Sequence, residues 1–358
     1  MILSIFSNCK IVKGINRSLI VDLQRSCYFI IPNDLTRFIE MVKGKDYKLF
    51  FSNLEDNDKN VVSSYVDFIL SNEIGFFHQK DILVDFGVLS SNYGTPYLLT
   101  NLSIEINANS IQVLDELGRR LEGKMIQCIE LICFKDIILP YQLFKIIDAL
   151  SSIAYDELRI ILKHTKEYSL DYVKKICMGN IQIFSFLLHS AEMEIDEMLE
   201  DGITSVTFQT NAIGSCFDCG KVSDKYFTSN KDFYFEGLLK NTCLNMKVGI
   251  DSAGNIKNCL SQMRSYGNIF EADLLDIFKS NDFQKLWNVT KDKVNKCKVC
   301  EFRMVCPDCR IFIEDPNDIY SAPLKCGYDP FTGLWNDWEI DLTKSKVFQG
   351  YKLKAQLV

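Results

Sequence analysis

The chain lacks several features that define common classes of protein. It contains no run of about 18 uncharged apolar residues, which a membrane-spanning helix requires. Its N-terminus, MILSIFSNCK, has neither the basic start nor the long apolar centre of a secretory signal peptide. Its 40 Lys and Arg are outnumbered by 47 Asp and Glu, whereas phosphate-backbone binding draws its affinity from basic clusters. We therefore expect a cytoplasmic protein whose main partner is neither a membrane nor a nucleic acid.

Common catalytic signatures are missing as well. The sequence has no Walker loop, no GxSxG nucleophile elbow and no GxGxxG loop after a predicted strand. Its three histidines, His78, His164 and His189, are far from any cysteine pair and are typical of surface or satisfied core positions. Because no pattern supplies an activated nucleophile or an open metal position, the sequence leaves open whether this chain alone catalyses any reaction.

Cysteine, by contrast, is abundant and unevenly distributed. The first 212 residues hold five of the 14 cysteines, scattered singly, and the other nine fall between positions 216 and 326. Three pairs have CxxC spacing: Cys216 with Cys219, Cys297 with Cys300, and Cys306 with Cys309. In a reducing compartment clustered cysteines indicate metal before disulfides, because a tight turn converges two sulfurs on one centre. Zinc and iron–sulfur clusters both fit this spacing.

The hydrophobic pattern predicts an α/β protein in three parts. Residues 1–90 carry strand patterns, two amphipathic helices and an apolar segment at 74–82, which together predict a compact winged-helix domain. Residues 95–212 alternate apolar strand patterns with helix patterns, the last at 194–201, as in an open or partial β/α barrel. Residues 213–358 lose regular periodicity, so they need cross-links or metal for order.

The spacing of seven cysteines resembles the signature of SPASM domains. Cys243 is followed by Gly254 and, with four residues between, by Cys259; the others are Cys297, Cys300, Cys306, Cys309 and Cys326. Two residues separate Cys306 from Cys309, where the family pattern has three. SPASM domains follow the catalytic barrel of radical SAM peptide maturases and carry two auxiliary [4Fe–4S] clusters.

The resemblance implies how the cysteines are shared between two clusters. One cluster would be held by Cys297, Cys300, Cys306 and Cys326. The other would be held by Cys243, Cys259 and Cys309, with Cys216 or Cys219 as its fourth ligand. Zinc in place of both clusters is the alternative that thiolate chemistry leaves open.

The middle part resembles a radical SAM barrel without its reactive centre. In that family a CxxxCxxC motif after the first barrel strand holds the cluster that binds S-adenosylmethionine. The corresponding loop here, NANSIQ at 107–112, contains no cysteine, and CxxxCxxC occurs nowhere in the chain. Cys128 and Cys133 lie in a strand pattern, and we expect them to be buried core residues. We therefore expect no S-adenosylmethionine cofactor.

A barrel without this motif before a SPASM domain resembles the SPASM-domain peptide maturases of grasp-with-spasm systems, which make graspetides. The resemblance implies two partners, a precursor peptide leader and an ATP-grasp ligase. Residues 1–90 are similar to the PqqD-like domain, in which a leader peptide adds a strand to a sheet edge. The expected peptide-binding residues are Tyr28, Ile30, Val62, Tyr65 and Val66; the alternative is that they form the domain core.

These features predict an accessory maturation protein for a ribosomally synthesised and post-translationally modified peptide. It would bind the precursor peptide, the ligase or both, and two [4Fe–4S] clusters would organise its C-terminal part. One alternative is an iron–sulfur redox enzyme or electron-transfer subunit in peptide modification. Another is a zinc-stabilised structural scaffold.

Overall fold

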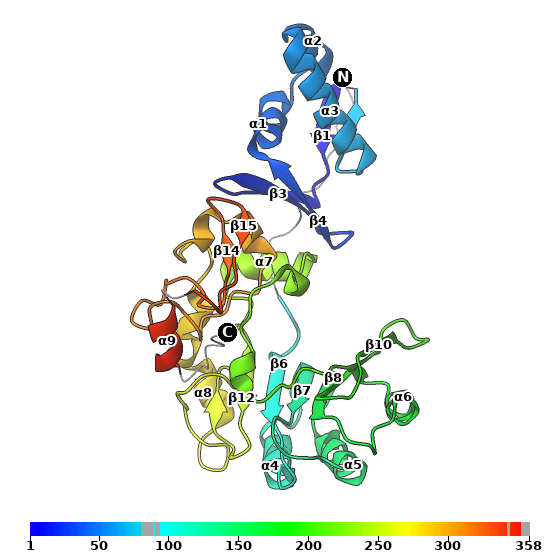
Figure 1. The fold of residues 1–358 in the computed structure, drawn as a ribbon, viewed down its shortest axis with the longest axis vertical. Helices are drawn as coiled ribbons and strands as arrows, with labels where there is room; N and C mark the ends of the chain where they lie inside the picture. The colour runs from blue at the N-terminus through cyan, green and yellow to red at the C-terminus, as the bar shows by residue number, and fades with distance from the viewer. Residues whose placement is uncertain (80–88, 90–93, 342–343, 352–358) are drawn as a thin grey trace. The chain divides into compact units, whose positions relative to one another are not determined.

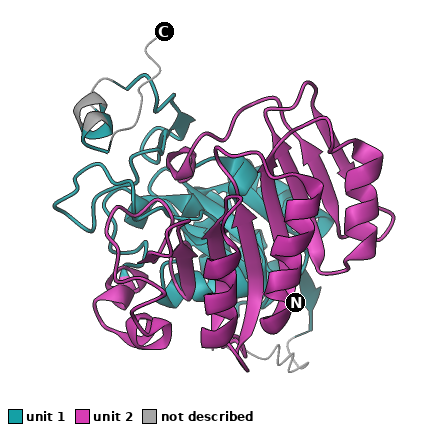
Figure 2. Ribbon diagram, turned by 90° about the horizontal axis from the view of Figure 1, so that it is seen from below, with its two compact units in different colours: residues 1–93, 222–242, 289–358 teal, residues 94–221, 243–288 magenta. Residues whose placement is uncertain are grey.

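The computed structural model describes residues 1–79, 89, 94–341 and 344–351 (Figure 1). The chain forms two compact units, which Figure 2 draws in different colours. Unit 1 comprises residues 1–93, 222–242 and 289–358, and unit 2 comprises residues 94–221 and 243–288. The sequence predicted as one C-terminal part, 213–358, therefore contributes segments to both units.

Unit 1 begins with an antiparallel sheet in the order β2-β3-β4, followed by helices α1, α2 and α3. Strand β1 pairs antiparallel with β5. The bounds are β1 Ile2–Ile5, β2 Cys9–Lys13, β3 Arg17–Asp22, β4 Cys27–Pro32, α1 Asn33–Val42, α2 Tyr47–Ser52, α3 Asp56–Ser71 and β5 Gly75–His78. The predicted strands and both predicted helices of this part are confirmed, whereas β1 and α2 were not predicted. The winged-helix assignment stays a prediction, and residues 80–82 of the expected wing lie outside the described residues.

Both faces of this small sheet are buried. On one face, Ile20 and Ile31 pack against apolar side chains of α1 and α3 at three- and four-residue spacing. On the other face, Val12, Leu19 and Val21 form a second core with residues of the cysteine-rich part of unit 1. That second core includes Tyr234, Phe235, Phe302, Met304, Val305 and Tyr328. The N-terminal sheet and the cysteine-rich part are thus packed together within unit 1.

The cysteine-rich part of unit 1 contains short elements joined by long irregular segments. They are η3 Asp224–Tyr226, α7 Lys231–Leu239, η5 Cys297–Val299, η6 Glu301–Met304, β14 Tyr328–Asp329, β15 Leu334–Trp335 and α9 Ser345–Gly350, where η marks a 3₁₀ turn. This pattern agrees with the predicted loss of periodicity.

The described residues of unit 2 form one sheet of eight strands in the order β10-β11-β9-β8-β7-β6-β12-β13. The bounds are β6 Leu99–Glu105, β7 Met125–Ile132, β8 Ala154–Lys163, β9 Ile183–His189, β10 Ile195–Met198, β11 Ser205–Phe208, β12 Lys247–Ile250 and β13 Ile256–Lys257. Neighbouring strands from β11 to β12 run parallel, and only β10 and β13, at the two ends, are antiparallel to their neighbours. The predicted parallel β/α arrangement is confirmed as an open sheet.

Helices α4, α5 and α6 each connect two successive parallel strands of this sheet. Their bounds are α4 Ile111–Arg120, α5 Pro140–Ala149 and α6 Leu170–Gly179; η1 Leu150–Ser152, η2 Cys216–Asp218, α8 Leu274–Lys279 and η4 Phe283–Asn288 complete the unit. Successive crossovers of the usual right hand place such helices on one face, as Figure 2 shows. Among the described residues, we find no helix with both the length and the apolar character needed to span a membrane.

The predicted helix at 194–201 is wrong, because this segment contains strand β10. Strand β10 pairs antiparallel with β11, with Met198 opposite Ser205. Gly202 in the connecting turn has a φ of 67°, and Asp201 accepts backbone hydrogen bonds from Ile203 and Thr204. Local turn chemistry at Asp201-Gly202 therefore prevails over the helix-like spacing of the apolar residues.

Candidate metal centre

Four predicted ligands line one cavity within unit 1: Cys297, Cys300, Cys306 and Cys326. Cys297 begins η5 and Cys300 directly follows it, and the Cys300 amide donates to the Cys297 carbonyl at 3.0 Å. The Cys306 amide donates to the Phe302 carbonyl at 3.0 Å, at the end of η6. The structure therefore places cysteines from three separate segments around one cavity, and their role as ligands stays a prediction.

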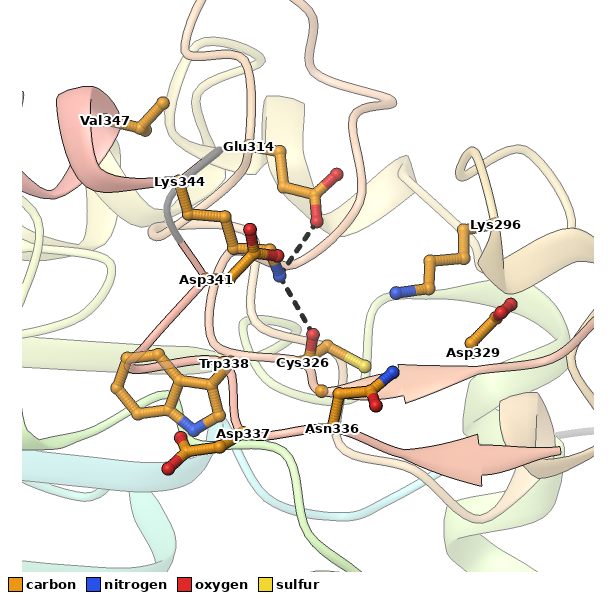
Figure 3. A pocket seen from close by; sticks show the side chains of 11 residues that line it. Lys296, Glu314, Cys326, Asp329, Asn336, Asp337, Trp338, Asp341, Lys344 and Val347 are labelled. Atoms are coloured by element: carbon orange, nitrogen blue, oxygen red, sulfur yellow. Dashed lines mark hydrogen bonds and ion pairs between the residues drawn. The ribbon is translucent and has the colours of Figure 1, made fainter. Parts of the chain in front are cut away.

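Two local features position the backbone next to Cys297 and Cys326. Lys296, directly before Cys297, has a φ of 68°, in the left-handed region that non-glycine residues rarely adopt. Lys344 lies directly before α9, and its buried ammonium donates to the carbonyls of Cys326 and Leu324 at 2.9 Å each. Figure 3 shows the bond to Cys326. The same ammonium pairs with Glu314 at 3.0 Å, which Figure 3 also shows. These bonds fix the backbone that carries Cys326.

The shortened spacing between Cys306 and Cys309 is held by a buried ion pair. Asp308 accepts a hydrogen bond from the Arg310 guanidinium at 2.6 Å, and both side chains are almost completely buried. A second carboxylate oxygen of Asp308 accepts from Asn241 at 3.0 Å. Because buried charges need such partners, these bonds connect the turn that carries the two cysteines to Asn241.

Aromatic rings surround the four-cysteine cavity. The Phe302 ring lies 5.0 Å from Tyr328, 5.1 Å from Phe227, 6.2 Å from Tyr28 and 6.4 Å from Trp335, between ring centroids. Phe227, Phe302, Tyr328 and Trp335 all line the cavity itself. An apolar shell of this kind limits the access of solvent and oxygen to a bound metal centre.

The four thiols share an environment that opposes ionisation. Burial raises the pKa of Cys297, and the negative charges of Asp308 and Cys306 raise it further. Burial likewise raises the pKa of Cys300, Cys306 and Cys326. A bound metal reverses this balance, because its positive charge stabilises thiolates.

The donor set fits a thiolate-bound metal. Four cysteine sulfurs in an apolar pocket suit zinc or a cubane iron–sulfur cluster, both of which take four thiolates. In the part of the chain that the structure describes, no three His, Cys, Asp or Glu side chains are already arranged to hold one metal ion.

Unit 2 contains four more of the predicted ligands: Cys216, Cys219, Cys243 and Cys259. Cys243 and Cys259 flank the hairpin of β12 and β13, whose turn contains the motif glycine. Gly254 has a φ of 84°, and a Cβ added there would lie 2.9 Å from Ile269 Cγ2. The structure thus requires glycine at this position both for backbone conformation and for space.

Asn258 connects the segments next to two of these cysteines. Its amide nitrogen donates to the carbonyls of Leu244 at 2.9 Å and Lys247 at 2.7 Å. Its amide oxygen accepts from the Trp287 indole at 3.0 Å. Asn258 precedes Cys259, so one buried side chain holds the Cys259 turn against the start of β12.

The other candidate ligands differ in exposure. Cys216 is half-buried beside Leu260, and its carbonyl accepts from the Ser261 hydroxyl at 2.5 Å. Cys219 is exposed, whereas Cys309 is buried within unit 1. The assignment of these cysteines to a second cluster stays a prediction, including the choice between Cys216 and Cys219.

The loop that corresponds to the radical SAM motif position is closed by its own hydrogen bonds. The Ser110 hydroxyl accepts from the Asn107 amide at 2.7 Å, and the Asn107 side chain accepts from the Asn109 amide at 2.8 Å. Cys128 and Cys133 are buried, as predicted, and burial raises the pKa of Cys133 to about 11. The expectation that the chain uses no S-adenosylmethionine stays a prediction.

The five predicted peptide-binding residues have different environments. Val62 and Val66 are buried in the core between sheet and helices, and the partly buried Tyr65 packs on Phe38. Tyr28 packs against the second core, and Ile30 is 47% exposed. Of this set, Ile30 offers the most accessible surface, on an outer strand of its sheet.

The sequence did not reveal the polar contacts that connect the N-terminal sheet to the cysteine-rich part. Arg17 Nε donates to the fully buried Glu301 at 2.6 Å, and Arg17 Nη2 donates to the Tyr328 hydroxyl at 3.1 Å. The Tyr328 hydroxyl also donates to Glu301. Arg17 and Glu301 are 284 positions apart, so no local pattern could have predicted their pairing.

Comparisons with known proteins bear on the C-terminal part. A family model described as SPASM, an iron-sulfur cluster-binding domain, matches residues 243–301. This range includes Cys243, Cys259, Cys297 and Cys300. No curated protein matches the chain.

Similar solved structures include Streptococcus suis SuiB bound to S-adenosylmethionine, at 13% identity over 87% of this chain and 96% of that chain. SuiB bound to precursor peptide SuiA is also similar, at 13% identity over 87% of this chain and 96% of that chain. The TM-scores are 0.32 and 0.29, so the strand order described above, and not these likenesses, defines the fold.

Proposed function

We propose that this chain is an accessory maturation protein for a ribosomally synthesised peptide, with iron–sulfur clusters in its cysteine-rich part. The observation that carries the proposal is the cavity lined by Cys297, Cys300, Cys306 and Cys326. The family match supports iron–sulfur chemistry in the sequence from 243 to 301, which includes Cys297 and Cys300. When bound, such a cluster supplies one-electron transfer or a cross-link between loop segments.

The metal content tests this proposal most directly. Protein purified without oxygen is expected to contain iron and acid-labile sulfide, with absorbance near about 400 nm typical of thiolate-bound clusters. The Cys300→Ser variant should lose part of that iron, whereas Cys177→Ser, in the core of α6, should keep all of it. Zinc without sulfide in the unsubstituted protein would establish the structural zinc alternative instead.

The peptide partner is proposed from the outer strand of the N-terminal sheet. Among the described residues, β4 pairs with β3 alone, so its other edge carries backbone groups available to an added strand. Ile30 is exposed on this strand and offers an apolar contact. We propose that a precursor leader peptide pairs with β4 and covers Ile30.

A point variant tests this better than removal of residues 1–90. Val12, Leu19 and Val21 pack against the cysteine-rich part, so deletion would expose the second core. Ile30→Lys is expected to weaken leader binding about tenfold or more, because it places a charge where an apolar contact forms. Met41→Lys, also exposed and on α1, is the matched control. Equal affinity of all three proteins, measured by anisotropy with a labelled leader peptide, would contradict the site.

The proposed second partner is an ATP-grasp ligase of the grasp-with-spasm type. Ligation of the precursor by that ligase should be slower without this chain than with it. An unchanged rate would refute the accessory role. If dithionite reduces a cluster and ligation depends on that reduction, the electron-transfer alternative replaces the docking role.

A further inference from the structure

Lys291 is a buried lysine beside the four-cysteine cavity. Its side chain is 3% exposed, and it lines the cavity together with Cys297, Cys300, Cys306 and Cys326. Within the described residues its ammonium has no hydrogen-bond partner. The nearest described aromatic contact is Phe233, whose ring centroid lies 5.5 Å from Nζ. Burial of an ammonium is costly unless a negative group compensates it.

Four other charged groups around the cavity, Arg303, Glu301, Asp308 and Lys344, already have partners. The Arg303 guanidinium donates to the carbonyls of Lys13 at 2.6 Å and Cys300 at 2.8 Å. Glu301 forms an ion pair with Arg17, and Asp308 forms one with Arg310. The ammonium of Lys344 is bonded to backbone carbonyls and Glu314. Lys296 also faces this region, near Cys326, but is only half-buried.

We propose that Lys291 is the buried counter-charge of a cluster at Cys297, Cys300, Cys306 and Cys326, and that it raises the reduction potential of that cluster. This proposal rests on the iron–sulfur cluster proposed above. Reduction takes one electron from an external donor and adds one negative charge to the cluster and its thiolates. A fixed positive charge nearby stabilises the reduced state more than the oxidised state. Lys291 is thus a positioning charge and touches no substrate.

The test compares three variants purified without oxygen. Lys291→Met keeps the length of the side chain and removes its charge, Lys291→Arg keeps the charge, and Lys293→Met is the exposed control. The measurements are iron and sulfide per chain and the midpoint potentials, titrated with dithionite and mediators. We expect Lys291→Met to lower the potential of one cluster, and both other variants to leave the potentials close to the unsubstituted values.

The possible outcomes separate this proposal from the function on which it rests. A full complement of iron with unchanged potentials in Lys291→Met would overturn the counter-charge and leave the cluster intact. Loss of the cluster in Lys291→Met but not in Lys291→Arg supports the counter-charge, because charge and not shape is then required. Loss in both variants would show a packing role and overturn the proposal. Absence of iron and sulfide from the unsubstituted protein would overturn both.

Discussion

The parallel sheet of unit 2 and the cysteine-rich segment 289–341 of unit 1 are ordered by different interactions. In the central strands β7 and β8, Ile129, Leu131, Leu158 and Ile160 are completely buried. Each such side chain contributes roughly 1.5–3 kcal/mol by leaving water. The regular strands also satisfy their own backbone groups, so this region needs no additional cross-link.

The cysteine-rich segment buries charged side chains in addition to apolar ones such as Phe302, Val305 and Leu324. Its buried residues include Lys291, Glu301, Asp308, Arg310 and Lys325, and its strands are only two residues long. Buried ion pairs contribute little net stability, because desolvation offsets their attraction. The comparison teaches that the parallel sheet specifies its own order, whereas this segment relies on an apolar core shared with the N-terminal sheet, on buried charges with specific partners and, in our proposal, on metal.

Metal removal should produce the largest difference in behaviour between the two regions. Structural zinc sites contribute about 10–16 kcal/mol of apparent binding free energy in small domains. We expect a chelator, or Cys300→Ser, to lower amide protection across 289–341 while strands β6 to β9 keep theirs. Hydrogen exchange measured by mass spectrometry checks this result. Equal protection of 289–341 with and without metal would remove the distinction.

The buried ion pair between the N-terminal sheet of unit 1 and the cysteine-rich segment gives the next largest effect. Arg17→Ala leaves the fully buried Glu301 without its cation, which costs about 3–5 kcal/mol for a buried pair, toward the lower end here because Arg17 is partly exposed. Arg37→Ala breaks an exposed pair with Asp34 and should cost under about 1 kcal/mol. Urea unfolding of both variants makes the comparison, and equal losses would argue against a role for burial.

Truncating a core side chain in the parallel sheet of unit 2 should lower stability without changing the metal content. Leu131→Ala is expected to lower the free energy of unfolding by about 2–5 kcal/mol, because it leaves a cavity in a central strand. Met125→Ala, on the same strand but 48% exposed, should change it by about 0.5 kcal/mol or less. Iron content per folded chain should stay constant in both. A fall in iron for Leu131→Ala would couple the two regions.

The smallest expected effect is a pH dependence of the metal-free protein. The four thiols have folded-state pKa values above their ordinary value of 9.0, so the folded chain holds more protons than the unfolded chain above about pH 9. Stability is therefore fully present below this pH and falls as the pH rises through the folded-state values. Urea unfolding at about pH 8 and about pH 10 should show this loss without metal, and much less with metal bound. An equal loss of unfolding free energy between the two pH values with and without metal would contradict this prediction.

Predictions from local periodicity succeeded where structure is local. Strands β6 to β9 and helices α4 to α6 follow from apolar runs and 3.6-residue spacing, which depend on neighbours in sequence. The segment at 194–201 failed because a turn at Gly202 makes a hairpin. Strands β12 and β13 were not predicted, because β12 is recognised as a strand only by its pairing with β6.

The sequence by itself determined the cysteine spacing, the glycine at position 254 and the alternation of strands with helices. Only the tertiary structure decided that Cys297, Cys300, Cys306 and Cys326 line one cavity and that Lys291 lies beside it. It also decided that both faces of the N-terminal sheet are buried, through Arg17 and Glu301 among others. The physical reason is that turns and helices depend on residues a few positions apart. Burial and charge pairing depend on residues that only the complete fold brings together.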